Sequence, residues 1–253
     1  IRKRLSAVKG GKFAGLCEPA AIFAIVLSDI VGDPLDMIAS GPAYADSSTA
    51  SDAIAIAEKY HLKLSEKART LLEMKTAKAV TNVETRITGS VRNLCLAAKE
   101  ACEKLGYESM ILTDALQCEA KEAGAFLAAI AKTHQNTDKS LAFIAGGETI
   151  VHVTGKGLGG RNQELALAAA PGLAGLKAAV FSVGSDGTDG PTDAAGGYVD
   201  GETARKLREK GVAISDVLEN NDAYHALLQT GGLIVTGPTG TNVNDLSVLL
   251  IRR

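Results

Sequence analysis

The sequence alternates between strand-like apolar runs and helical patterns, and this alternation limits the folds open to the chain. Strands that alternate with helices indicate an α/β fold with mostly parallel sheets flanked by helices. Ligands in open α/β sheets bind beyond the carboxyl ends of the strands, so polar loops at these places predict a binding site. Turns and helix caps favour the same residues, which is the alternative explanation. Loops rich in glycine, aspartate or asparagine follow most of the apolar runs, namely SDIVGD, AGGE, VGSDGTDG and TGPTGTNVND.

Residue periodicity places the individual elements. Apolar runs predict strands over 22–29, 109–113, 141–147, 149–155 and 177–184. Apolar residues at helical spacing predict helices over 51–61, 91–105, 119–134, 162–170 and 202–211. The polar link at 135–140 is the best candidate boundary, which predicts two domains, 1–136 and 137–253.

Charge and composition exclude some partners. The 27 basic and 29 acidic residues give a formal charge of −2, which leaves no electrostatic footprint for nucleic acid. No apolar run reaches the roughly 20 residues that span a bilayer, so we expect no membrane partner. The four cysteines form no C-x-x-C pair, which is typical of reduced thiols in a cytoplasmic protein. The first residues, IRKRLSAVKGGKFAG, lack an initiator methionine and resemble the middle of a longer chain, so we expect a fragment.

The segment TIVHVTGKGLGGRNQELALAAA has the spacing G-x-G-x-x-G at Gly155, Gly157 and Gly160, before a predicted helix. The backbone N–H groups of such a loop, which also includes Gly159, can hold a phosphate together with the helix N-terminus. A dinucleotide site would also need an acid after the next strand, where Asp186 is roughly placed. The alternative is a flexible loop that simply leads into a short helix.

Arg161 stands at the expected start of that helix. A guanidinium there adds positive charge to the helix dipole and offers a fork of donors to phosphate or carboxylate. An ion pair with Glu164, three residues later, or with another acid would instead fix the loop. Asn162 is a candidate N-cap of the helix.

The loop VGSDGTDGPTDAAGG at 183–197 concentrates three aspartates, Asp186, Asp189 and Asp193. Their carboxylates could ligate Mg²⁺ or bind the hydroxyls of a substrate. Alternatively, they make turns and cap a short helix at DAAGG. The loop at 236–245 offers hydroxyls and amides to a polar ligand but lacks the Walker pattern of a nucleotide-binding loop.

Five segments carry a resemblance to a known family: RLSAVKGGKFA, LSDIVGDPLDMIASGPAYADSST, GGETIVHVTGKGLGGRNQELALA, SDGTDGPTDAAGG and NNDAYHALLQTGGLIVTGPTGTNVNDL. In this order they resemble the bacterial and archaeal glycerate 2-kinases, long labelled hydroxypyruvate reductases. The resemblance implies an active site in the cleft between two α/β domains. Residues 1–136 would be the remnant of a Rossmann-like N-terminal domain, and 137–253 the domain called MOFRL. Family members also have a preceding N-terminal part with a catalytic lysine.

The activity that this resemblance implies is ATP-dependent phosphorylation of D-glycerate at its 2-hydroxyl, with ATP and Mg²⁺ as cofactors. A homodimer is a further expectation. The resemblance also implies that the arginine of the GGRNQE motif, here Arg161, is catalytic. This fits the need of phosphoryl transfer for positioning and for positive charge on the moving phosphate. Asp186 and Asp189 are the expected metal ligands. The expected contacts to substrate or phosphate are Gly157, Gly159, Gly160, Asn162, Glu164, Asp189, Asp193, Asn242, Asn244, Asp245, Lys9 and Asp29.

Two other functions remain open. An NAD(P)H-dependent hydroxypyruvate reductase would use the G-x-G-x-x-G match, although the sequence shows no convincing His/Arg/Glu set for hydride transfer to a 2-keto acid. A non-catalytic ligand-binding module would keep the α/β fold, although the many polar loop residues favour an active enzyme.

Overall fold

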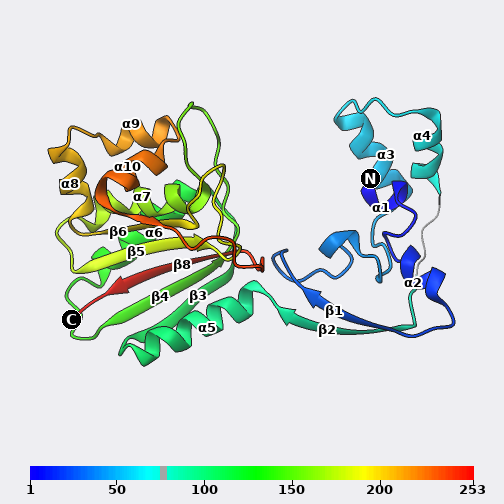
Figure 1. Cartoon of the computed structure of the whole chain (residues 1–253), viewed down its shortest axis with the longest axis horizontal. Helices are drawn as coiled ribbons and strands as arrows, with labels where there is room; N and C mark the ends of the chain where they lie inside the picture. The colour runs from blue at the N-terminus through cyan, green and yellow to red at the C-terminus, as the bar shows by residue number, and fades with distance from the viewer. Residues whose placement is uncertain (75–78) are drawn as a thin grey trace. The chain divides into compact units, whose positions relative to one another are not determined.

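The computed structural model describes residues 1–74 and 79–253, which form two compact units, 1–88 and 89–253 (Figure 1). The predicted division at 136 does not coincide with this one. Residue 136 lies inside the second unit, between a helix and a strand. The strands before and after it, β3 (Glu108–Leu116) and β4 (Leu141–Gly147), pair in parallel in one sheet. The polar link at 135–140 therefore only returns the chain to the same sheet.

Unit 1 contains a two-stranded sheet of β1 (Ile22–Leu27) and β2 (Val83–Gly89) together with short helices. The side chain of Thr49 accepts a hydrogen bond from the N–H of Asp52, and the Asp52 carboxylate accepts one from the N–H of Thr49. This reciprocal cap begins the predicted helix α3. The helices are α1 (Arg2–Leu5), α2 (Lys12–Cys17), the 3₁₀ helix η1 (Ile38–Ser40), α3 (Ala50–Lys59) and α4 (Glu66–Glu73).

Unit 2 contains a six-stranded sheet in the order β3–β4–β8–β5–β6–β7. The last strand of the chain, β8, lies between β4 and β5. Its first residue, Asp245, is opposite Gly147 at the end of β4 and opposite Gly184 at the end of β5. The loops that follow β4 and β5 therefore meet at one edge of the sheet. The remaining strands are β5 (Ala178–Gly184), β6 (Gly196–Asp200), β7 (Leu233–Ile234) and β8 (Asp245–Ile251).

Helices cover both faces of this sheet, because residues along each central strand alternate between two apolar clusters (Figure 1). Ile144 and Val248 pack towards α5 (Val91–Lys104) on one face. Phe143 and Leu249 belong to the cluster on the other face. The helices packed there are α6 (Ala120–Thr133), α7 (Arg161–Leu173), α8 (Thr203–Glu209), α9 (Ile214–Glu219) and α10 (Ala223–Thr230).

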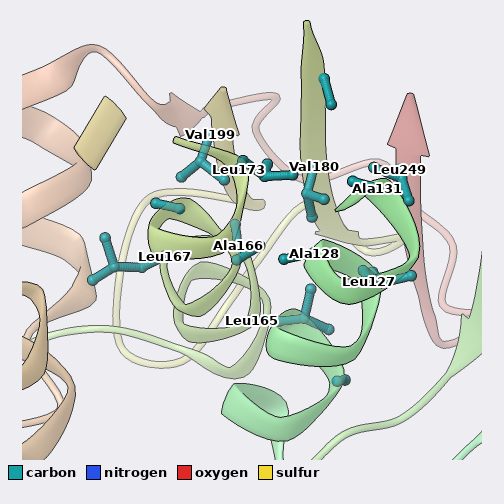
Figure 2. Close-up of a cluster of buried hydrophobic side chains, with 14 of the residues drawn as sticks. Leu127, Ala128, Ala131, Leu165, Ala166, Leu167, Leu173, Val180, Val199 and Leu249 are labelled. Atoms are coloured by element: carbon teal, nitrogen blue, oxygen red, sulfur yellow. The ribbon is translucent and has the colours of Figure 1, made fainter. Parts of the chain in front are cut away.

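The core between α6 and α7 is built mainly from leucine and alanine (Figure 2). Leu127 and Ala128 of α6 meet Leu165 and Ala166 of α7 in one buried cluster. A Cβ atom on Gly124 would lie 2.1 Å from the carbonyl oxygen of Leu165, so only glycine permits this approach of the two helices. Close packing of small residues therefore fills a core that has few aromatic side chains, and it fixes α7, the helix that carries Arg161.

The α/β class with flanking helices is confirmed, but the expectation of mostly parallel pairing is wrong for the six-stranded sheet. Within that sheet only β3 and β4 pair in parallel, whereas β4–β8, β8–β5, β5–β6 and β6–β7 are antiparallel. The cause is that β6 follows β5 without an intervening helix and β8 returns from the end of the chain to the middle of the sheet. Strand and helix alternation along a sequence does not reveal such insertions.

Two local predictions are wrong. The apolar run at 149–155 forms no strand, apart from one isolated bridge between Ile150 and Glu119. The segment DAAGG forms no helix, since β6 begins at Gly196. The described residues contain no helix that is both long and apolar enough to cross a membrane.

Candidate functional site

Unit 2 contains a cavity of about 720 Å³ that the segment after β4, the glycine-rich loop and the first turn of α7 line together. Three sequence motifs thus meet at one place, the edge where the first residue of β8 lies opposite the ends of β4 and β5. Of the predicted site residues, Gly157, Gly159, Gly160, Arg161 and Glu164 line the cavity.

Arg161 is held at the edge of the sheet by two acids. Its Nε and Nη2 donate to the two carboxylate oxygens of Asp245, the second over 3.0 Å. Its Nη1 lies 3.5 Å from Oε1 of Glu148, which follows β4 directly. These contacts raise the pKa of the guanidinium, chiefly through the hydrogen bond to Asp245, so Arg161 stays charged. The predicted ion pair with Glu164 is absent from the described contacts, and another acid takes its place.

Asp189 occupies the N-terminus of α7, the position where a phosphate was expected. Its Oδ1 accepts from the backbone N–H of Asn162, and its Oδ2 accepts from the backbone N–H of Gln163 over 2.9 Å. The side chain is buried, and desolvation raises the pKa of its carboxyl although these bonds act in the opposite direction. The helix N-terminus therefore has an internal carboxylate as its cap, and Asp189 is not available as a metal ligand.

The glycine-rich loop is fastened to the segment Asn220–Asp222. Oδ1 of Asn221 accepts from the N–H groups of Thr154 and Gly155. Asn220 and Asp222 accept from the next three N–H groups, so the N–H groups of residues 154–158 are already used, including that of Gly157 in the predicted phosphate cradle. A Cβ atom on Gly155 would lie 2.2 Å from the carbonyl oxygen of Asn220, which explains the glycine by this close approach.

Gly159 and Gly160 retain the donors that a ligand could use. Within 1–74 and 79–253, the N–H groups of these two residues donate to no protein acceptor, and both residues line the cavity. Two backbone donors beside the Arg161 guanidinium form a site for a few oxygens of an anion. The cradle is therefore shorter than the sequence motif indicated.

Glu164 lies in the wall of the cavity and is buried, with 5% of its surface exposed. Its Oε2 accepts a hydrogen bond of 3.2 Å from Nδ2 of Asn221. Burial raises the pKa of this carboxyl. Glu164 also lines a second, smaller cavity of about 160 Å³ with Glu119 and His152.

The other aspartates of the loop at 183–197 do not form a metal centre with Asp189. Asp186 accepts from the N–H of Thr188 within its own turn, and the exposed Asp193 accepts from the hydroxyl of Tyr224. In the part of the chain that the structure describes, no group of three or more His, Cys, Asp or Glu residues could hold a metal ion. The expectation that Asp186 and Asp189 ligate magnesium therefore does not fit the geometry.

Three predicted residues lie beneath or outside the cavity. Asn162 is buried, and its side chain bridges Ser182 and Asp189, so it is the second residue of α7 rather than its N-cap, which is Gly160. Asn242 is exposed, and its side chain accepts from the N–H of Asn244, which is buried. These side chains shape the loops around the cavity instead of lining it.

Lys9 and Asp29 belong to unit 1. Lys9 donates over 2.7 Å to the carbonyl oxygen of Ala39, a non-glycine residue with a φ of 51°. It therefore stabilises the turn at η1. Asp29 is exposed two residues after the end of β1.

Sequence reasoning missed Glu148, Thr149 and Asn221, which all line the cavity. The sequence did contain a signal for the first two, because GGET directly follows a strand-like run. Asn221 had a weaker signal. Its φ of 53° requires a left-handed conformation, which the dipeptide Asn-Asn tolerates better than most residues.

Comparisons with known proteins agree with these motifs. Residues 141–245 match the MOFRL family, and residues 1–73 match a domain of unknown function, DUF4147. The chain is 51% identical, over 99% of its length, to D-glycerate 2-kinase of Thermotoga maritima, of which it covers 61%. It is 34% identical over its whole length to glycerate kinase of Macaca fascicularis, of which it covers 78%.

A solved structure shows the same fold. The crystal structure of glycerate kinase from Thermotoga maritima matches all of this chain with a TM-score of 0.92 at 51% identity, and 62% of that chain is covered. The chain thus spans about three fifths of the length of its Thermotoga relative. From these matches, the chain belongs to the glycerate kinase family.

Proposed function

We propose that this chain carries the phosphoryl-transfer site of an ATP-dependent D-glycerate 2-kinase, which forms 2-phosphoglycerate. The observation that carries the proposal is the position of Arg161. Its charged guanidinium lies at a 720 Å³ cavity that Gly159 and Gly160 also line, and among the described residues the N–H groups of these two glycines have no protein acceptor. Positive charge and oriented N–H donors are what the transferred phosphoryl group requires. The relatives named as glycerate kinases support the choice of substrate.

Arg161 is oriented before any ligand binds. The Nε and Nη2 groups of Arg161 donate to Asp245. Its Nη1 group remains near Glu148, which lines the cavity. A phosphate oxygen would replace or share the weak 3.5 Å contact with Glu148, whereas the bidentate pair with Asp245 would persist. The buried Asp245 thus fixes the orientation of the guanidinium, and ligand binding would displace the exposed Glu148.

Magnesium belongs to this proposal only as part of the substrate, MgATP. The described aspartates do not form a resident metal site, since Asp189 caps α7 and Asp186 closes its own turn. The ion would therefore be carried by the nucleotide phosphates.

The geometry does not favour the hydroxypyruvate reductase alternative. A dinucleotide fold needs a strand before the glycine loop and a free helix N-terminus for the pyrophosphate. Here no strand immediately precedes the loop, Asn220–Asp222 occupy its donors, and Asp189 caps the helix.

A cytoplasmic location and a homodimer are parts of the same proposal. Free thiols at all four cysteines agree with a reducing compartment. Sedimentation or light scattering of the purified protein would test the homodimer.

The test supplies the complete gene product with D-glycerate, ATP and Mg²⁺ and identifies the product by phosphorus NMR. Formation of 2-phosphoglycerate is the expected result. NADH oxidation with hydroxypyruvate, without phosphoryl transfer, would reject the kinase assignment.

A further inference from the structure

The carboxylate of Glu164 has surroundings that a purely structural acid would not need. It is buried in the wall of the cavity, and the hydrogen-bond donor that it meets is the neutral amide of Asn221. Among the described residues, no lysine, arginine or histidine forms an ion pair with it. A buried carboxylate that lacks a cation is costly, so its retention next to a ligand-sized cavity indicates a role in function.

The position of Glu164 on α7 adds to this indication. It lies three residues after Arg161, so the two side chains project from the same face of the helix, one turn apart. Both line the same cavity. One wall therefore presents a cation for a phosphate and, beside it, a proton acceptor that the cation does not neutralise, since Arg161 pairs with Asp245 and Glu148.

Asn221 holds Glu164 in place. Its Nδ2 donates to Glu164 and to the carbonyl oxygen of His152, while its Oδ1 binds the N–H groups of Thr154 and Gly155. One amide side chain thus joins the carboxylate to the loop that leads into the glycine motif. Its φ of 53° lies in the left-handed region, which asparagine adopts more readily than most residues other than glycine.

We propose that Glu164 is the catalytic base that accepts the proton of the acceptor hydroxyl, and that Asn221 positions it. This inference rests on the proposed kinase function. The hydroxyl proton passes to a carboxylate oxygen of Glu164 while the acceptor oxygen bonds to the γ-phosphorus. The bond from that phosphorus to the β–γ bridging oxygen breaks, ADP leaves with the electron pair, and the proton is later released to water.

The charged groups around Glu164 set its titration. Lys121 favours the ionised form, whereas Glu119 and Asp189 disfavour it, and burial is the largest influence. His152 contacts Glu119 and lines the smaller cavity together with Glu164, and Arg161 precedes Glu164 on the same helix. A base whose pKa is raised towards neutrality suits proton abstraction at physiological pH.

The first test compares Glu164→Gln with Glu119→Gln in the complete gene product. Both variants replace a carboxylate by an amide of the same shape, but Glu119 lines only the smaller cavity and bonds to His152 and Lys121. We expect Glu164→Gln to lower kcat for D-glycerate on the order of 10²-fold or more, with KM for ATP retained and the acidic limb of the pH profile lost. Glu119→Gln should keep wild-type kcat. Wild-type turnover and an intact acidic limb in folded Glu164→Gln would overturn the inference.

A second variant keeps the test decisive if Glu164→Gln does not fold. Asn221→Asp retains the acceptor oxygens for Thr154 and Gly155 but places a negative charge beside Glu164. A like charge raises the pKa of a carboxyl, so the acidic limb of kcat should move to higher pH. An unmoved limb would argue against Glu164 as the base. Failure of the kinase proposal can be told apart from failure of this inference. If the wild-type protein forms no 2-phosphoglycerate, the kinase proposal itself is rejected. If the wild type is active and the variants behave like it, only the role of Glu164 is rejected.

Discussion

Arg161, the first residue of α7, and Asp245, the first residue of β8, form a bidentate pair across 84 positions of sequence. Asp245 is buried between the ends of β4 and β5, so the sheet fixes the carboxylate and the carboxylate fixes the guanidinium. A planar guanidinium that is bound on one edge keeps its remaining donors in a defined direction. The fold thereby places a positive charge at the cavity with little freedom to move.

Removal of Arg161 should therefore abolish most of the activity without unfolding the protein. For Arg161→Ala we expect kcat for D-glycerate to fall by roughly 10²-fold or more, because the charge on the moving phosphate loses its donor. Arg205→Ala is the matched control, since Arg205 is exposed and its ion pairs among the described residues are local, with Glu202 at the N-cap of α8 and with Glu209 at its end. Steady-state kinetics with circular dichroism would check both variants. Equal turnover in the two variants would restrict Arg161 to a structural role.

The two neighbouring glycines of the loop should respond differently to alanine. A Cβ atom on Gly160 would lie 2.3 Å from the carboxylate carbon of Asp189, whereas the nearest atom to a Cβ on Gly159 is 3.3 Å away. The Asp189 carboxylate would have to leave its helix donors, so Gly160→Ala should lower the free energy of unfolding by about 2 kcal/mol or more. Gly159→Ala should cost less than about 1 kcal/mol. Urea denaturation would measure the difference, and equal losses would contradict the close approach to Asp189.

Asp189 should be the aspartate of its loop that stability depends on most. Asp189→Ala removes the cap of α7 and leaves the buried N–H groups of Asn162 and Gln163 without an acceptor. We expect a loss of about 2–4 kcal/mol in the free energy of unfolding. The control is Asp193→Ala, which removes one hydrogen bond at the surface to Tyr224 and should cost about 0.5 kcal/mol or less. Similar losses for both would mean that the cap contributes little.

Local patterns predicted most of the elements, whereas long-range pairing decided the rest. The helices α3, α5, α6 and α7 were predictable because the spacing of their apolar residues is a local property, as are the side-chain caps of α3 and α5. The direction of the strands was not, since the position of β8 between β4 and β5 depends on contacts between residues that are far apart in the sequence, such as Gly184 with Asp245 and Leu141 with Ile251. Predictions from periodicity alone therefore gave the class of the fold and the wrong strand directions.

The candidate site shows the same division. Arg161 and the glycines were predictable from residue type beside a helix start. The role of Asp189 was not, because an aspartate that caps a distant helix has the same local sequence as one that binds a metal. Neither was the role of Asn221, since the hydrogen bonds of its side chain reach back across the chain to His152, to the start of the glycine loop and to Glu164.

The burial of Glu164 should also appear in the pH dependence of stability. Burial raises the pKa of this carboxyl above its value in the unfolded chain. Below the unfolded value, both states are protonated and the residue costs nothing. As pH rises through the folded value, the folded state must ionise a buried group, so the stability that the protonated form provides is lost. Glu164→Gln does not ionise, so its unfolding free energy relative to wild type should increase from pH 4 to pH 8.

Urea denaturation of wild type and Glu164→Gln at several pH values would measure this difference. The control is Glu119→Gln, because Glu119 is more exposed and its contacts with Lys121 and His152 lower the pKa of its carboxyl. The unfolding free energy of Glu119→Gln relative to wild type should change in the opposite direction and decrease as pH rises. A pH-independent difference for Glu164→Gln would show that the carboxylate is better solvated than its burial indicates. We expect Glu164→Gln to gain stability relative to wild type at higher pH and to lose kcat, which is the pattern of a buried acid that is retained for function.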